Sequence, residues 1–103
     1  MKSEEFKTET LLEETGKSTH LTDREKHLIG MAVTSTRGCI VCTGNRIKKA
    51  LESGVPYDTI IAGIDLASAV NAGTTVAIAT QGADLTKIDE ICPDGICTTG
   101  VPE

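Results

Sequence analysis

The hydrophobic positions of this chain recur at helical spacing, and no segment alternates with a period of two over more than a few residues. Thr22 and Glu25 form a T-x-x-E capping box directly before the apolar run LIGMAV, which predicts a helix that continues to Arg37. Gly38 can adopt the left-handed conformation that commonly ends a helix. The pattern therefore predicts an all-α fold.

Further helices are predicted on both sides of this one. Phe6, Leu11 and Leu12 stand among charged residues and indicate a short helix over residues 3–14, ended by Gly16. A stripe of apolar positions predicts a helix over residues 39–54. Pro56 suits the first turn of the next helix, which we expect the Asn-Ala-Gly stretch at 71–73 to stop, before another helix begins at residue 74 or 75.

The length of 103 residues allows one hydrophobic core and is too short for two. We expect an N-terminal helix and linker over residues 1–20, a helical core over residues 21–91, and a cysteine-containing tail over residues 92–103. The run 28–33 is apolar nearly all round, which indicates a helix buried in a core or at a subunit interface. A core with so few aromatic side chains buries little area, so we expect a homo-oligomer.

Composition excludes several classes of protein. The formal charge of −5 and the presence of only two aromatic residues, Phe6 and Tyr57, argue against a nucleic-acid-binding protein. No apolar run approaches the roughly 20 residues that span a bilayer, and the start MKSEEFKTET lacks the features of a signal peptide. These observations predict a cytoplasmic chain without membrane contact.

Four cysteines in a reducing compartment are expected to serve catalysis or metal binding. Cys39 and Cys42 form a C-x-x-C pair at the predicted start of a helix, where the backbone amides, together with Arg37 and Arg46, would lower a thiol pKa from about 8.5. Residues three apart on one turn lie about 5–6 Å from each other, within the range of a disulfide. A redox dithiol is the favoured interpretation, and half of a zinc site or two inert buried cysteines remain alternatives.

A second pair, Cys92 and Cys97, flanks a Pro-Asp-Gly turn that could bring the two sulfurs together. This pair could act as a relay dithiol for the first, or it could complete a four-cysteine metal site. It could equally belong to a tail without a role. We expect no metal and no cofactor, because the first pair lies in a helical pattern rather than in the strands and knuckles of a zinc ribbon.

From Thr22 to Ile78 the sequence resembles the carboxymuconolactone decarboxylase and alkylhydroperoxidase D family. The resemblance is carried by an apolar helix, R-G-C-x-x-C, a basic helix that ends in A-L-x-x-G, a turn and a helix of small residues. It implies an all-α fold whose protomers associate as dimers, trimers or hexamers. It also implies a peroxiredoxin-type antioxidant enzyme that reduces a peroxide, or an adaptor that exchanges electrons with a disulfide substrate or a thiol-reductant protein.

Two positions depart from the family pattern. Redox-active members carry a histidine four residues after the second cysteine, and this chain has Arg46 there. They carry a glutamate twelve residues before the first cysteine, and this chain has His27 there. Arginine stays protonated and can only stabilise a thiolate, whereas a histidine can act as the base or lie on the surface without a role.

The identity of the attacking thiol is open between two arguments. The family assigns peroxide attack to the second cysteine, Cys42, whereas ionisation at a helix start favours Cys39. We lean to Cys42 for peroxide chemistry. A lactone decarboxylase that uses His27 and Arg46 is an alternative activity within the same family, although its decarboxylases generally lack the cysteine pair.

Overall fold

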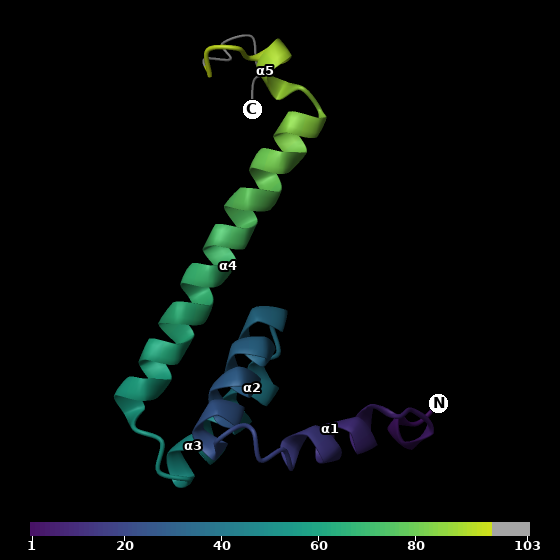
Figure 1. Cartoon of the computed structure of the whole chain (residues 1–103), viewed down its shortest axis with the longest axis vertical. Helices are drawn as coiled ribbons and strands as arrows, with labels where there is room; N and C mark the ends of the chain where they lie inside the picture. Colours follow the sequence, from purple (N-terminus) through teal and green to yellow (C-terminus); the bar gives the residue numbers. More distant parts are fainter. Residues whose placement is uncertain (96–103) are drawn as a thin grey trace. The chain divides into compact units, whose positions relative to one another are not determined.

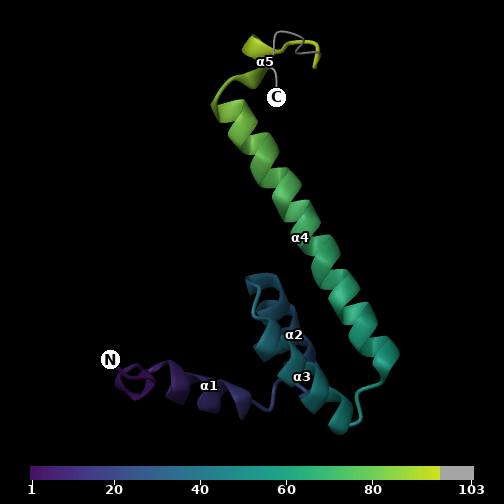
Figure 2. The same cartoon turned by 180° about the vertical axis from the view of Figure 1, so that it is seen from behind.

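The computed structural model describes residues 1–95, which form helices and turns without a strand (Figures 1 and 2). The helices are η1, a 3-10 turn over Ser3–Glu5, and then α1 (Thr8–Gly16), α2 (Asp23–Arg37), α3 (Ile40–Glu52), α4 (Tyr57–Leu85) and α5 (Ile88–Ile91). The all-α prediction is confirmed. The chain divides into two compact units, Met1–Ala67 and the part from Ser68 onward, so that α4 crosses from one to the other, and each unit is described by itself.

Local signals set both ends of α2 as predicted. The Thr22 hydroxyl accepts a hydrogen bond from the Glu25 amide at 3.1 Å, and the Glu25 carboxylate accepts one from the Thr22 amide at 2.8 Å. The bond from the Thr22 amide to the carboxylate, with a smaller contribution from the Thr22 side chain, holds the pKa of Glu25 below its usual value. At the other end Gly38 has φ 84°, a left-handed conformation that suits glycine because it has no Cβ.

The core of the first unit lies between α2 and α3, which pack side by side (Figure 1), and the start of α4 contributes apolar side chains to it. Met31 and Ala50 are almost completely buried at 1% and 0% exposure, and Val55 and Ile60 complete the buried set. The partly buried side chains around them are Leu28, Ile47 and Ile64. The absence of a Cβ at Gly63 matters here, because an added one would lie 3.0 Å from Leu28 Cδ2.

Much of the apolar surface of α2 and α3 is not covered by the rest of residues 1–95. In the run 28–33 only Met31 is fully buried, and Ile29 and Val33 are about half exposed. Ile40, on the predicted apolar stripe of α3, is 88% exposed. Burial of this run on most sides is therefore wrong for the single chain, and its burial by a second subunit stays a prediction.

The N-terminal region is less regular than the helix predicted over residues 3–14. Its backbone becomes extended at Phe6, which separates η1 from α1. Gly16 is the last residue of α1, in agreement with the prediction. Neither η1 nor α1 contributes a buried residue, and the domain boundaries expected from the sequence stay a prediction.

The predicted break at residues 71–73 is wrong, because α4 runs through it as one helix of 29 residues. Asn71 and Gly73 lower helix propensity without removing a backbone hydrogen bond, as a proline would. The hydroxyls of Thr74 and Thr75 donate to the carbonyls of Val70 and Asn71, one turn earlier, at 3.1 and 2.8 Å. The cost of two weak helix formers is about 1 kcal/mol or less per residue, which is too small to end a helix that also contains several alanines, the best helix formers.

Because α4 is continuous, it contains a longer apolar stretch than the sequence pattern predicts. It is long and apolar enough to cross a bilayer by length and composition alone, with a mean hydropathy of 1.4 in its most apolar window. No charged residue lies between Asp65 and Asp84. Core helices of soluble proteins pass the same test, so the expected absence of membrane contact stays a prediction.

The second unit contains the rest of α4, then α5 and a turn. Lys87, which precedes α5, has φ 57° and thereby changes the chain direction. The predicted Pro-Asp-Gly turn is present, since the Gly95 amide donates to the Cys92 carbonyl at 3.2 Å and Gly95 has φ 71°.

Candidate functional site

Cys39 and Cys42 are joined as a disulfide at the start of α3. Their Cα atoms lie 5.4 Å apart, within the range that disulfides allow and as the three-residue spacing predicts. Cys39 precedes the first residue of α3 and Cys42 stands in its first turn. The predicted position of the pair at a helix start is confirmed.

Cys39 occupies the N-cap position, where serine, threonine or aspartate usually stands. Its Sγ accepts a hydrogen bond from the Cys42 amide at 3.2 Å, so this sulfur meets one of the unpaired amides of the helix start. Such an amide and the helix dipole favour a thiolate over a thiol. The local electrostatic argument for Cys39 therefore has a specific contact behind it.

The two cysteines also differ in solvent exposure, and this difference favours the other sulfur. Cys39 is half-buried, whereas Cys42 is exposed. A group that meets a substrate must be accessible, which favours Cys42 as the attacking sulfur. Capping thus favours Cys39 and exposure favours Cys42, and the identity of the attacking sulfur stays a prediction.

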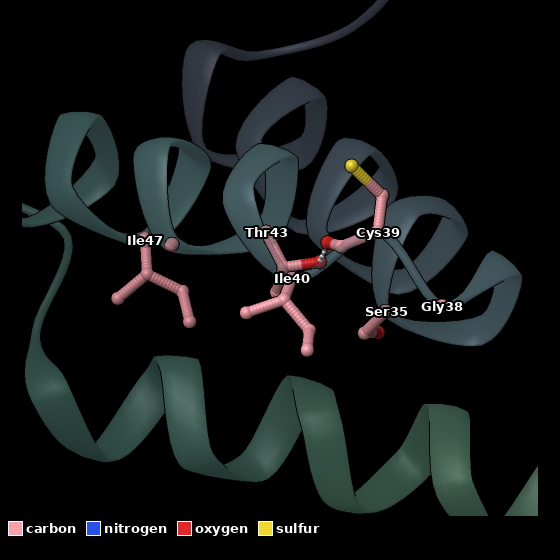
Figure 3. Close-up of a pocket in the computed structure, with 7 residues that line it drawn as sticks. Ser35, Gly38, Cys39, Ile40, Thr43 and Ile47 are labelled. Carbon is pink, nitrogen blue, oxygen red and sulfur yellow. Dashed lines mark hydrogen bonds between the residues drawn. The ribbon is translucent and has the colours of Figure 1, made fainter.

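Two threonines that the sequence did not single out connect the cysteine turn to α2. The Thr43 hydroxyl donates to the Cys39 carbonyl at 2.7 Å (Figure 3). The same hydroxyl lies 2.9 Å from the Thr34 hydroxyl of α2. The Thr34 hydroxyl in turn donates to the Gly30 carbonyl at 3.1 Å. The sequence could have indicated the bond from Thr43 to Cys39, because Thr43 stands four residues after the N-cap. It could not indicate the contact with Thr34, which depends on how α2 and α3 align.

An open, mainly apolar pocket of about 380 Å³ lies beside the cysteine turn. Figure 3 shows Ile40 and Ile47 pointing to one side of α3 and the sulfur of Cys39 pointing to the other. The pocket therefore borders the backbone of Cys39 rather than its reactive atom. Its lining residues are Ser35, Gly38, Cys39, Ile40, Thr43, Gly44 and Ile47.

Arg46 lies one helical turn after Cys42 and its side chain packs on α2. It is half-buried, and its guanidinium lies directly over Gly30, where no side chain intervenes. This contact directs the Arg46 side chain from α3 toward α2. No hydrogen bond or ion pair joins Arg46 to another of residues 1–95.

His27 is not brought next to the thiols. It is half-buried on α2, and twelve residues of helix between it and Cys39 correspond to about 18 Å. Because α2 and α3 run antiparallel, the pairing of Gly30 with Arg46 places His27 one turn further from the cysteines than Arg46. Its catalytic role stays a prediction, as does the influence of Arg37, whose side chain is exposed at the end of α2.

The second cysteine pair can be followed only in part. Cys92 follows α5 and is half-buried, while Cys97 lies outside the described residues, so both the relay dithiol and the four-cysteine metal site stay predictions. Within residues 1–95, no group of three or more His, Cys, Asp or Glu side chains is arranged to hold a metal ion.

Comparison with known proteins bears on the resemblance found in the sequence. Neither the curated proteins nor the solved structures that were compared contain a match to this chain. The family model described as the carboxymuconolactone decarboxylase family matches residues 7–85, which include the cysteine pair, Arg46 and His27. The match covers most of the chain, and the chain therefore belongs to the carboxymuconolactone decarboxylase family.

Proposed function

We propose that this protein is a thiol-dependent oxidoreductase of the alkylhydroperoxidase D type. The observation that carries the proposal is the Cys39–Cys42 disulfide, formed by an N-cap sulfur and an exposed sulfur on the same helical turn. Such a pair can be oxidised and reduced without rearrangement of the helix that holds it. Peroxide reduction and thiol-disulfide exchange both use this chemistry.

In the peroxidase reaction, the reduced Cys42 thiolate attacks the terminal oxygen of a hydroperoxide and the oxygen–oxygen bond breaks. The leaving oxygen takes up a proton and departs as an alcohol, or as water from hydrogen peroxide, and Cys42 becomes a sulfenic acid. The Cys39 thiolate then attacks the Cys42 sulfur, and the hydroxyl group leaves as water when it is protonated. Two electrons pass from the dithiol to the peroxide, and an external dithiol protein restores them.

The charged neighbours take different parts in this scheme. Arg46 stays protonated and so cannot accept the thiol proton, but its positive charge can stabilise the Cys42 thiolate. His27 is the remaining candidate for the proton acceptor. Its distance along α2 requires an additional carrier for the proton, such as a water molecule or a group of a second subunit.

The family name supports one other candidate, decarboxylation of a ring lactone. In that reaction Arg46 would hold a substrate carboxylate with its planar guanidinium, and the cysteines would have no chemical part. The two functions therefore differ in whether the cysteine pair is needed.

The deciding experiment titrates the free thiols of the reduced protein before and after one equivalent of peroxide. We expect two thiols to disappear and the peroxide to be consumed. Cys42→Ser should abolish consumption, whereas Cys39→Ser should leave a sulfenic acid at Cys42 that dimedone traps. Unchanged thiols, together with turnover that survives Cys42→Ser, would exclude the proposed function.

A lactone substrate assayed with the same variants tests the decarboxylase. Loss of lactone consumption in Arg46→Ala, with full activity in a variant that lacks both cysteines, would favour the decarboxylase over the oxidoreductase.

A further inference from the structure

The Arg46 side chain of α3 packs directly on the backbone of Gly30 in α2. A Cβ added at Gly30 would lie 2.9 Å from Cζ and 3.2 Å from Cδ of Arg46, and nearer still to Nη1. Contacts this short are not tolerated between real atoms, so any side chain at position 30 would displace the guanidinium. Arg46 occupies its present position because residue 30 is glycine.

Glycine in this position is not explained by the conformation of α2. Gly30 is in the middle of the helix and is not among the glycines with positive φ, so the backbone does not require it. Glycine inside a helix is less stable than alanine. The space that it leaves is filled by Arg46, which gives a packing reason for a residue that otherwise weakens the helix.

The position of Arg46 on Gly30 bears on the reactive cysteine pair, because Arg46 and Cys42 lie on neighbouring turns of α3. Cys42 and Arg46 are four residues apart on α3 and so share one face, with their Cβ atoms about 6 Å apart. Arg46 is half-buried against α2, which limits the directions in which its charge can turn. An arginine without this seat would extend into water, where its charge would be screened.

The other charged groups around the hairpin do not duplicate this arrangement. Lys48 and Lys49 of α3 are exposed, as is Arg37 at the end of α2. Lys26 and His27 are half-buried, but they lie further from the cysteine turn than Gly30 does. In the part of α4 that packs on the hairpin, the charged residues are Asp58 and Asp65, both exposed.

We propose that Gly30 is a positioning residue, whose missing side chain seats the Arg46 guanidinium one turn from Cys42 and so keeps the Cys42 thiol in its reactive thiolate form. The inference deepens the proposed function and rests on it for its catalytic meaning. Gly30 acts only through Arg46 and touches neither sulfur nor substrate.

The test measures the iodoacetamide reaction of each cysteine against pH in the reduced protein, with the sites resolved by mass spectrometry. In Gly30→Ala we expect the Cys42 rate at pH 7 to fall about threefold or more, and its pH midpoint to rise, because the positive charge has moved away. Cys39, whose sulfur is held by the helix-start amide, should change less.

Arg46→Ala should lower the Cys42 rate at least as much, and adding Gly30→Ala to it should have no further effect. Gly44→Ala is the matched control, because an added Cβ at that glycine of α3 meets nothing within 4 Å although it lies two residues from Cys42. It should leave both rates unchanged.

An unchanged Cys42 rate in Gly30→Ala would overturn the inference, and so would a fall of equal size in the Arg46→Ala background. If Gly30→Ala fails to fold, Arg46→Lys is the deciding variant, because it keeps the positive charge but not the planar guanidinium that packs on Gly30. A Cys42 alkylation rate equal to that of the wild type then refutes the proposal, and a reduced rate supports it. Thiol alkylation needs no catalytic turnover. If Gly30→Ala lowers the Cys42 alkylation rate as expected but the wild type consumes no peroxide, only the proposed function is refuted.

Discussion

The α2–α3 hairpin and the helix α4 differ in how their contacts are specified. In the hairpin, a capping box starts one helix, a left-handed glycine ends it, a cysteine caps the next, and threonine and arginine side chains cross between the two. In α4 only Ile60 is buried, and the helix carries exposed apolar side chains along its length. The difference shows that capping residues and short-range contacts can define the turn that carries the cysteines. They do not define which surface covers the exposed apolar side chains of a long helix such as α4.

The largest effect is expected where the hairpin is buried. Met31→Ala should lower the free energy of unfolding by about 2–5 kcal/mol, because it leaves a cavity in a core with few members. Val33→Ala, two residues further along α2 and about half exposed, should cost about 0.5 kcal/mol or less. Urea unfolding followed by circular dichroism measures both.

The Val33 variant also probes what covers the exposed face. If its cost approaches that of Met31→Ala and depends on protein concentration, this face is buried between subunits in solution. A small, concentration-independent cost would contradict the expected homo-oligomer at this face.

Alanine substitutions at two glycines should change the stability of the protein in opposite directions. Gly38→Ala should destabilise the protein by about 1–2 kcal/mol, because φ 84° is unfavourable for a residue with a Cβ even where space is open. Gly73→Ala should stabilise α4 by about 0.5–1 kcal/mol, because a continuous helix favours alanine. Thermal melts of the two variants test both signs, and a destabilising Gly73→Ala would restore the break predicted from the sequence.

The smallest effect concerns the capping box. Because the pKa of Glu25 is lower in the folded protein than in the unfolded chain, its ionised form contributes stability above the unfolded pKa. That contribution is lost as the pH falls through the folded pKa. The stability difference between the wild type and Glu25→Gln should therefore shrink between pH 6 and about pH 3, and a constant difference over that range would contradict it.

Features that depend on neighbouring residues could be predicted from the sequence, and features that depend on alignment between helices could not. The T-x-x-E box, Gly38 and the cysteine pair each act within one turn, so residue types and spacing were sufficient. The seat of Arg46 on Gly30 requires knowing which turn of α2 faces which turn of α3. The predicted stop at residues 71–73 was wrong because weak helix formers lower stability by small amounts and, unlike proline, leave the backbone hydrogen bonds of the helix intact.

The short spacing of the cysteine pair limits what its disulfide can do for the fold. The bond joins residues separated by three positions, so it removes little freedom from the unfolded chain. On the loop-entropy relation, closing a loop of about four residues is worth about 2 kcal/mol, against about 4.7 for a loop of about 100. A bond that constrains so little chain is a weak structural cross-link, and the protein can lose and regain it at modest cost to its folded state.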